Sequence, residues 1–372
     1  MKKEQIYVTK PYLPDLDDFI PLLKDIWERR WLTNNGFYHQ QFESQLAEYM
    51  NISNISLISN GTLALLLALK ALDITGNVIT TPFSFVATTH SLYLNGIEPV
   101  FADIDPVTYN LNPKEVEKKI NQQTKAILPV HVFGNPCNVE EFKKLSDKYK
   151  IPVIYDAAHA FGVKINNTPL LNFGELSILS FHATKVFNTF EGGAIVCRTK
   201  ETKQKIDLLK NFGFTDEITV VGPGINAKMN EFQSALGILQ LRDINEVIRR
   251  RKEVFNNYQN LLANTNGITL PAAAENIQSN YSYFPILVDQ SNYGLSRDDL
   301  YNLLKENGYY TRRYFYPLIS HFPIYNTLPS ANRQNLPVAE RIAEQVLCLP
   351  IYPDIEEEII RQISDIIKNQ AL

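Results

Sequence analysis

Short apolar runs alternate with amphipathic stretches along the first half of the chain. The runs have the length and composition of buried strands, and they occupy residues 55–59, 77–81, 99–102, 125–129, 151–155, 176–181 and 194–197. The stretches between several of them, including 63–72 and 138–149, predict helices. Sustained alternation of strands and helices predicts an α/β fold with a mostly parallel sheet that helices cover.

Local signals mark where some helices begin. Asn112 stands at an N-cap and Pro113 at the first helical position, with an acidic residue in the first turn. Ser84 is placed to cap another helix. Further along, Ser296 begins a helix with the arrangement of a capping box, and residues 281–288 alternate like a strand.

One long helix is predicted over residues 231–262, and the pattern changes after it. We therefore place a domain boundary near residue 245. A large domain is expected over 1–245, and a smaller C-terminal α+β domain over 246–372. The basic run 249–252 within the helix is interpreted as a solvated face, with an anion site as the alternative.

Composition argues against several kinds of binding partner. The chain has 372 residues and a net charge of −4, with 36 basic and 40 acidic residues, which argues against a nucleic-acid partner. The cysteines lie far apart and the histidines are scattered, so we expect neither a disulfide framework nor a metal. Because no secretory signal and no membrane-length apolar run is found, we expect a cytoplasmic protein that does not bind membranes.

The residues that follow each predicted strand form the candidate site, because parallel α/β sheets bind ligands beyond the carboxyl ends of their strands. These residues lie in the segments 60–62, 82–85, 131–135, 156–159 and 182–185. They are polar, small or ionisable, unlike the residues of a structural rim. The pattern therefore predicts a functional site at this edge of the sheet.

Lys185 and Asp156 are the candidates for chemistry. A buried lysine favours its neutral amine, which can form an imine with an aldehyde or ketone; a surface lysine in a loop is the alternative for Lys185 alone. Asp156 ends an apolar strand, where a buried carboxylate needs a cationic partner. The protonated pyridine nitrogen of pyridoxal phosphate (PLP) would supply one. A helix terminus or Lys185 itself is the alternative partner.

A phosphate site and ring contacts would complete such a cofactor site. Gly61 and Thr62 begin a helix whose free N–H groups favour an anion, unless they form an ordinary turn, and Ser180 can add a hydroxyl. Phe85 either stacks on a pyridine ring or packs in the core. His159 either bonds a phenolic oxygen or is a structural histidine. The order of these residues with Asp156 and Lys185 is that of PLP enzymes with the aspartate-aminotransferase-like fold, fold type I.

Three segments carry a resemblance to a known family. They are Ser59-Asn60-Gly61-Thr62-Leu63-Ala64-Leu65, Tyr155-Asp156-Ala157-Ala158-His159-Ala160 and Ser180-Phe181-His182-Ala183-Thr184-Lys185, with Glu191-Gly192-Gly193 after them. Together they closely resemble the DegT/DnrJ/EryC1/StrS family of PLP-dependent nucleotide-sugar aminotransferases. The similarity runs from Val8 to about Pro353. The branch that forms dTDP-4-amino-4,6-dideoxyglucose is the one that the chain looks most like.

The resemblance implies a role for each matching residue. Lys185 is implied to attach the cofactor and to act as general acid and base. The other implied cofactor contacts are Asp156 at the pyridine nitrogen, Gly61, Thr62 and Ser180 at the phosphate, Phe85 on the ring and His159 at the phenolic oxygen. The family also implies a homodimer with shared active sites. In it, Asn226 or Lys228 would reach the neighbouring subunit's cofactor phosphate.

The family's chemistry implies L-glutamate as amino donor and a nucleotide-linked keto-sugar as acceptor. The best match is dTDP-4-dehydro-6-deoxy-D-glucose, in O-antigen or lipopolysaccharide biosynthesis; a 3-keto sugar or a UDP- or GDP-linked sugar is the alternative. The aromatic and basic segment 309–316 could pack on a base and pair with a diphosphate. The candidate substrate contacts, each with a structural alternative, are Thr33, Asn35, Arg312, Tyr316 and His321. A sensor that keeps the PLP fold without catalysis is the alternative of another class.

Overall fold

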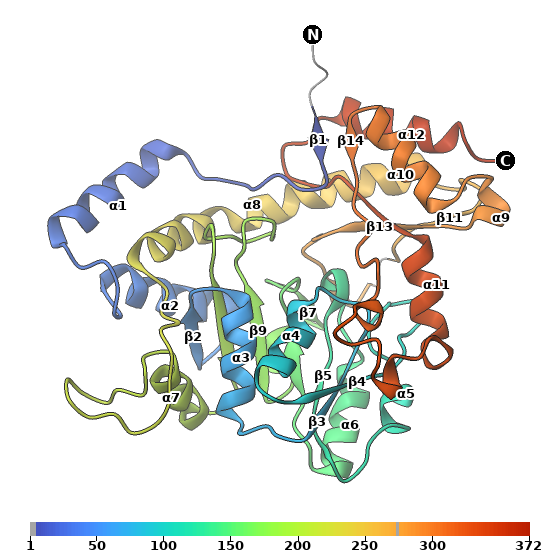
Figure 1. The fold of residues 1–372 in the computed structure, drawn as a ribbon. Helices are drawn as coiled ribbons and strands as arrows, with labels where there is room; N and C mark the ends of the chain where they lie inside the picture. Colours follow the sequence, from blue (N-terminus) through green and yellow to red (C-terminus); the bar gives the residue numbers. More distant parts are fainter. Residues whose placement is uncertain (1–4, 273–274) are drawn as a thin grey trace.

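The structure, a computed structural model, describes residues 5–272 and 275–372, and a sheet of seven strands lies at its centre (Figure 1). The strands lie in the order β2 (Ile55–Ile58), β10 (Gly193–Cys197), β9 (Leu176–Ser180), β6 (Ile154–Asp156), β5 (Thr124–Leu128), β3 (Asn77–Thr80) and β4 (Glu98–Phe101). Two bridges, Ile127 to Val153 and Val130 to Asp156, join β5 to β6 and so connect the two halves of the sheet.

The strand directions confirm the prediction of a mostly parallel sheet. β3 pairs in parallel with β4 and β5, β6 pairs in parallel with β9, and both bridges between β5 and β6 are parallel. β10 runs antiparallel to its neighbours β2 and β9. The carboxyl ends of the parallel strands therefore meet at one edge of the sheet.

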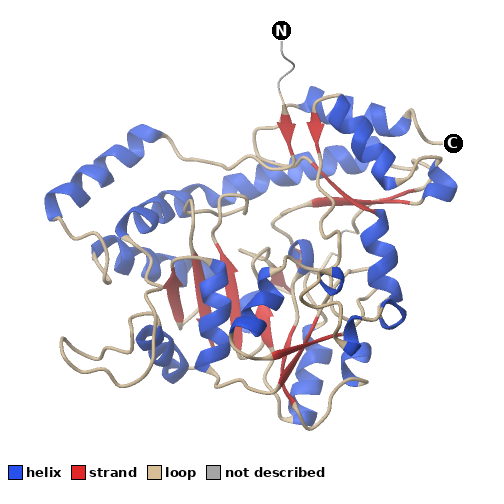
Figure 2. Ribbon diagram, viewed as in Figure 1, coloured by secondary structure: helices blue, strands red, loops and turns tan. Residues whose placement is uncertain are grey.

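Helices cover both faces of the sheet (Figure 2). The α-helices of the described residues are α1 (Leu16–Arg29), α2 (Phe37–Met50), α3 (Gly61–Ala71), α4 (Ala87–Leu94), α5 (Pro113–Glu117), α6 (Val139–Tyr149), α7 (Lys200–Leu209), α8 (Glu231–Leu262), α9 (Gln290–Tyr293), α10 (Arg297–Glu306), α11 (Pro337–Gln345) and α12 (Glu357–Lys368). Val78 of β3 packs with α3, α4 and α7 on one face, whereas the next residue, Ile79, packs with α2, α6 and α8 on the other. Side chains of a strand alternate between faces, so buried strands need apolar residues at both kinds of position.

The predicted helix starts are correct at two of three places. The Asn112 side chain accepts a hydrogen bond from the N–H of Lys114 at 3.0 Å, and Ser296 forms a capping box with Asp299. The prediction for Ser84 is wrong, because α4 begins at Ala87 and its N-cap has no side-chain cap bond. The buried Ser84 hydroxyl instead forms a hydrogen bond with a side chain inside α4, which removes it from the capping position.

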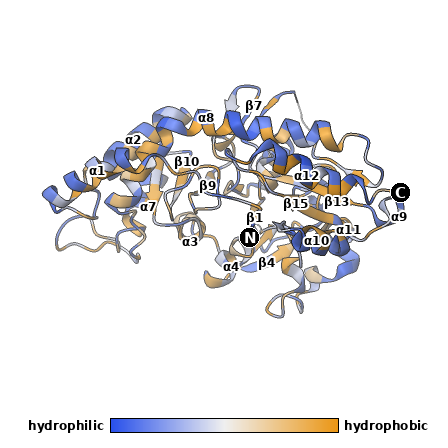
Figure 3. Cartoon of the chain, turned by 90° about the horizontal axis from the view of Figure 1, so that it is seen from above, coloured by the Kyte–Doolittle hydropathy of each residue, from blue (hydrophilic) through white to orange (hydrophobic). Residues whose placement is uncertain are grey.

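α8 contributes to three hydrophobic clusters. Ala235, Leu236 and Leu239 pack with α1 and the start of α2. Ile244 and Val247 pack in the cluster under the central sheet, and the residues from Val254 onward pack in a cluster with α10 and α12. Figure 3 shows hydrophilic and hydrophobic residues alternating along it. The domain boundary near residue 245 stays a prediction. The interpretation of the basic run is wrong for one residue, since Arg251 is buried and donates to the carbonyls of Tyr281 and Ser282.

The C-terminal part has its own antiparallel sheet of β11 (Ile268–Thr269), β13 (Phe284–Val288) and β15 (Val346–Leu349). The N-terminal strand β1 (Ile6–Tyr7) pairs in parallel with β14 (Tyr309–Tyr310) of this part. The remaining strands β7 (Lys164–Ile165), β8 (Thr168–Pro169) and β12 (Ile277–Gln278) form a small separate sheet. Among the described residues, no helix combines the length and apolar composition that crossing a bilayer requires.

Candidate active site

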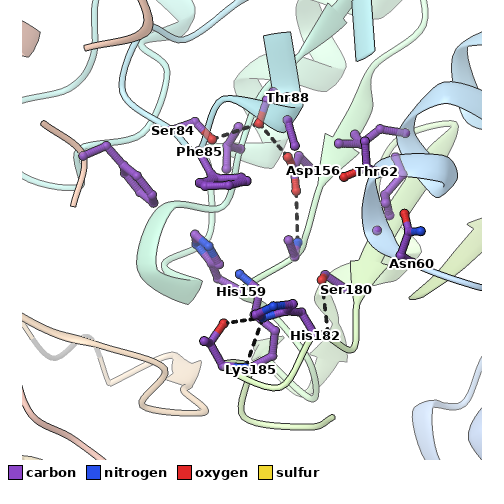
Figure 4. Close-up of a pocket in the computed structure, with 18 of the residues that line it drawn as sticks. Asn60, Thr62, Ser84, Phe85, Thr88, Asp156, His159, Ser180, His182 and Lys185 are labelled. Atoms are coloured by element: carbon purple, nitrogen blue, oxygen red, sulfur yellow. Dashed lines mark hydrogen bonds between the residues drawn. The ribbon is translucent and has the colours of Figure 1, made fainter. Parts of the chain in front are cut away.

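A cavity of about 660 Å³ opens at the carboxyl ends of β6 and β9, beside the first turn of α3 (Figure 4). Seven residues that the sequence singles out line it: Gly61, Thr62, Phe85, Asp156, His159, Ser180 and Lys185. They come from four segments that are far apart in the chain. The structure therefore brings the predicted cofactor residues together around one cavity, while their roles stay predictions.

The first turn of α3 forms a cradle for an anion. The Asn60 side chain caps the helix by accepting a hydrogen bond from the N–H of Leu63 at 2.9 Å. A Cβ at Gly61 would lie 2.8 Å from Cβ of Ser180, so only glycine lets these two segments approach so closely. The turn thus offers backbone N–H groups beside the hydroxyls of Thr62 and Ser180, a donor set that suits a phosphate.

Asp156 ends β6 with its carboxylate at the cavity and only 4% of its surface exposed. Oδ2 accepts a hydrogen bond from the Thr88 hydroxyl at 2.8 Å, and Oδ1 accepts one from the N–H of Ala158 at 3.1 Å. Burial raises the pKa of Asp156, whereas these two donors and the Lys185 charge favour the ionised form. The carboxylate keeps lone pairs for a further donor, as a cationic ring nitrogen would be.

Lys185 lies in the loop between β9 and β10, where its N–H donates to the carbonyl of His182 at 2.9 Å. Burial lowers the pKa of Lys185 to about 8, and the nearby Asp156 carboxylate opposes this shift. An amine with such a pKa is neutral in a substantial fraction of molecules near neutral pH. It can therefore act as a nucleophile toward a carbonyl or as a base.

His159 and Phe85 present aromatic surface to the cavity. Nδ1 of His159 accepts a hydrogen bond from the N–H of Phe133 at 3.3 Å, which assigns the proton of the neutral ring to Nε2. Burial, together with the Lys185 charge, lowers the pKa of His159 well below its usual range. The ring stacks on Phe315 with a centroid distance of 5.9 Å. Phe85 is 59% exposed, so one ring face is open to a ligand.

Several lining residues were not among the candidates. They are Ser84, Thr88, His182, Glu191, Tyr283, Tyr314 and Phe315. The sequence held a signal for five of them. Ser84 lies in the segment 82–85 that follows a predicted strand, His182 and Glu191 belong to the motif segments, and Tyr314 and Phe315 lie in the aromatic segment 309–316. No local signal marks Thr88, because it lies inside a helix and its role depends on a distant strand.

The other predicted site residues lie away from this cavity in the same chain. Asn226 is exposed, and Nζ of the half-buried Lys228 donates to Oδ1 of Asn211 at 2.9 Å. Thr33 and Asn35 lie in an exposed turn before α2. None of these four lines the cavity, and their roles stay predictions.

The three C-terminal candidates have local partners. Arg312 is exposed, although its backbone bridges to Cys348. The Tyr316 ring lies under the guanidinium of Arg297 at 4.5 Å. Nε2 of His321 lies 2.7 Å from a carboxylate oxygen of Glu340. Contacts of Arg312, Tyr316 and His321 with a substrate stay predictions.

The cavity fits a cofactor that carries a phosphate, a basic ring nitrogen and a carbonyl. The cradle at α3 suits the phosphate, Asp156 suits a protonated ring nitrogen, and Lys185 offers an amine for the carbonyl. PLP combines these three groups in one molecule.

Comparisons with known proteins agree with this arrangement. The model of the DegT/DnrJ/EryC1/StrS aminotransferase family matches residues 15–368. The chain is 49% identical over 368 residues to a protein from Escherichia coli named dTDP-4-amino-4,6-dideoxy-D-glucose transaminase, with 99% of each chain covered. It is 48% identical over 367 residues to a protein of the same name from Shigella dysenteriae, covering 98% of this chain and 99% of that one.

A solved structure is similar over almost the whole fold. A crystal structure of DesI, determined in the presence of its TDP-sugar product, superposes with a TM-score of 0.94 at 33% sequence identity, covering 99% of this chain and 93% of DesI. The likeness includes the central sheet and the C-terminal part, so the α/β architecture expected from the sequence is confirmed at the level of the complete fold.

Proposed function

Because the chain belongs to the DegT/DnrJ/EryC1/StrS aminotransferase family, we propose that it is a PLP-dependent transaminase of nucleotide sugars. Its acceptor is dTDP-4-dehydro-6-deoxy-D-glucose, its donor is L-glutamate, and its product is dTDP-4-amino-4,6-dideoxy-D-glucose. The observation that carries the proposal is the pair of Lys185 and Asp156 at one cavity, beside an anion cradle. The names of the relatives support the choice of sugar.

Each part of the cofactor has a matching group in the cavity. The N–H groups of the first turn of α3 and the Ser180 hydroxyl hold the phosphate. Asp156 pairs with the protonated ring nitrogen, and Phe85 covers a ring face. The proton on Nε2 of His159 is available to the phenolic oxygen. When bound, PLP supplies an electron sink that stabilises negative charge on the carbon next to the amino group.

Lys185 serves as the base of the reaction. A general base works best when its pKa lies near the working pH, and burial brings that of Lys185 to about 8. Its amine removes the proton from the α carbon of glutamate in the first half of the cycle. In the second half, it delivers a proton to the sugar carbon that receives the amino group.

The acceptor sugar lies against the aromatic side of the cavity. Tyr283 and Tyr314 line it there, and aromatic faces pack well on the apolar faces of sugars. The nucleotide extends toward the exposed residues Arg312 and Tyr316, where an arginine can pair with the diphosphate. Thr33, Asn35 and His321 are the remaining candidate contacts.

The working unit is a homodimer in the cytoplasm, and its product enters surface-polysaccharide synthesis such as that of O-antigen. Support for the dimer comes from Asn226 and Lys228, which lie outside the cavity of their own chain. One of them reaches the cofactor phosphate of the neighbouring subunit. Exposed apolar side chains at Ile218, Val220 and Val221 in the same region also suit burial against a second copy.

Absorbance spectroscopy tests the proposal. The purified protein with PLP should show a visible band that bleaches with L-glutamate and returns with dTDP-4-dehydro-6-deoxy-D-glucose. A bleach without return would reject this acceptor and favour a 3-keto sugar or a UDP- or GDP-linked sugar. A band that glutamate does not change would favour a cofactor-binding sensor. If no band forms, and Lys185→Ala behaves like the wild type, the cofactor assignment is wrong.

A further inference from the structure

Three buried polar side chains at the cavity form a hydrogen-bonded chain: Ser84 before α4, Thr88 within α4 and Asp156 at the end of β6 (Figure 4). Oγ of Ser84 lies 2.9 Å from Oγ1 of Thr88, and Oγ1 of Thr88 lies 2.8 Å from Oδ2 of Asp156. All three residues are at most 4% exposed. Because these three side chains are almost fully buried, the hydrogen bonds between them are electrostatically stronger than bonds in water.

The chemistry of the groups gives the chain a direction. An ionised carboxylate only accepts hydrogen bonds, so the single proton of Thr88 points to Asp156. Thr88 must then accept from Ser84, whose own proton points to Thr88. Each hydroxyl in such a chain polarises the next one and strengthens the bond at its end.

We propose that Ser84 and Thr88 are positioning residues that hold the Asp156 carboxylate toward the ring nitrogen of the cofactor. The inference rests on the proposed function, since it assumes PLP in the cavity. The backbone of Asp156 is fixed as well, because its N–H donates to the carbonyl of Pro129 at 2.9 Å and its carbonyl accepts from the N–H of His131 at 3.0 Å. The side-chain rotation is what remains to be set, and Thr88 and the N–H of Ala158 set it.

The hydrogen bonds from Ser84 through Thr88 also reduce the cost of burying the charge of Asp156. Burial raises the pKa of Asp156, and the Thr88 hydroxyl is the first group that opposes the shift. Four other titratable groups lie around Asp156. The charge of Lys185 also favours the carboxylate, whereas Cys137 is buried and burial keeps His131 and His159 neutral. Without the hydroxyl, Asp156 would take up a proton at a higher pH and lose its attraction for a cationic ring.

The test compares two adjacent threonines of α4. Thr88→Val removes the hydroxyl that bonds Asp156 and keeps the shape of the side chain. Thr89→Val is the matched control, because Oγ1 of Thr89 is equally buried but has no hydrogen-bond partner within the described part of the chain. Thr88→Ser restores a hydroxyl. The readouts are the dissociation constant of PLP, titrated by absorbance or fluorescence, and its dependence on pH.

We expect Thr88→Val to weaken PLP binding about tenfold, the usual effect of losing a hydrogen bond to a charged group. The acidic side of its pH profile should move to higher pH, and Thr88→Ser should recover most of both effects. Thr89→Val should match the wild type. Equal affinity and an equal pH profile for the two valine variants would overturn the inference. If the wild type itself binds no PLP, the proposed function fails first.

Ser84→Ala keeps the inference testable if Thr88→Val does not fold, which thermal melting would reveal. Without Ser84, the Thr88 hydroxyl loses the donor that polarises it, and its bond to Asp156 becomes weaker. We expect a smaller loss of PLP affinity, about threefold, with the pH profile moved in the same direction. A Ser84→Ala protein that binds PLP as the wild type does, at every pH, would contradict the directed chain.

Discussion

Asp156 is buried at the cavity and Lys185 is partly buried there, and the loss of solvent moves both of them toward the neutral form. It lowers the pKa of Lys185 to about 8 and raises that of Asp156, while the charge of each opposes the shift of the other. Such a pair is costly to fold, because burial removes solvent from the charged form of each group. At the residue scale, these two groups of the proposed active site therefore lower the free energy of unfolding of the protein.

A variant without the lysine amine should show this cost. We expect Lys185→Met to raise the unfolding free energy of the cofactor-free protein at pH 7 by on the order of 1 kcal/mol. The pKa of Lys185 is about 8 in the folded protein and 10.5 for an ordinary lysine. The cost of burying the charged amine is therefore complete below pH 8 and is lost as the pH rises toward 10.5. Urea unfolding at pH 7 and pH 10 measures it.

The control for this prediction is Lys24→Met, which changes an exposed lysine of α1 and should leave the unfolding free energy nearly unchanged at both pH values. A Lys185→Met protein that is less stable than the wild type at pH 7 would show that the amine makes a net favourable contact. A gain that persists unchanged at pH 10 would show that the effect is one of packing and not of charge.

At the element scale, most strands and helices of the central sheet follow from local apolar patterns. The prediction of 231–262 for the long helix matches α8 (Glu231–Leu262). The errors have physical reasons. Ser84 has the right residue type for a cap, but a partner four positions later holds its hydroxyl. Arg251 belongs to a charged run, yet it faces the segment 280–283, a contact that no local pattern encodes.

Arg251 links α8 to the wall of the cavity. It donates to the carbonyls of Tyr281 and Ser282, at 3.0 Å and 2.8 Å, and Asn280 and Ser282 donate in turn to the carbonyl of His159. We expect Arg251→Leu to destabilise the protein by about 2–3 kcal/mol, because buried carbonyls lose their donor. Chemical denaturation monitored by circular dichroism measures the change.

The neighbouring Arg250 provides the comparison for this variant. It is exposed and pairs with Glu246 on the helix surface, so Arg250→Leu should change stability by no more than about 0.5 kcal/mol. If both variants lose the same small amount, the buried bonds of Arg251 contribute less than their geometry indicates. The link to His159 would then be too weak to matter for the cavity.

At the scale of the whole molecule, the cavity draws on segments that lie between residues 60 and 315. The sequence located the part built on the central sheet, because each of those residues follows a strand. It could not place Tyr283 or Phe315 at the cavity, because their position depends on how the C-terminal part packs against the sheet. The contacts of Asn226 and Lys228 with a second subunit depend on how two copies of the chain assemble, and they stay predictions.

A ligand that contacts so many segments should stabilise the entire fold. We expect PLP at 100 times its dissociation constant to raise the unfolding free energy by about 2.7 kcal/mol, as mass action requires when only the folded state binds. Pyridoxal, which lacks the phosphate, should shift the melting temperature less at the same concentration, since it leaves the cradle at α3 empty. Equal shifts for the two compounds, measured by differential scanning fluorimetry, would contradict the assignment of Gly61 and Ser180 to the phosphate.

The antiparallel direction of β10 determines the kind of loop that holds Lys185. Ser180 at the end of β9 pairs with Gly193 at the start of β10, so the chain between them leaves and re-enters the sheet at the same edge. A parallel strand would have needed a crossover to the opposite edge. The segment with Lys185 is instead a short loop closed at its base by a strand pair, which limits the entropy that it loses on ordering. The base of this loop is thereby fixed at the edge of the sheet where the cavity opens, which keeps the proposed base of the reaction beside that edge.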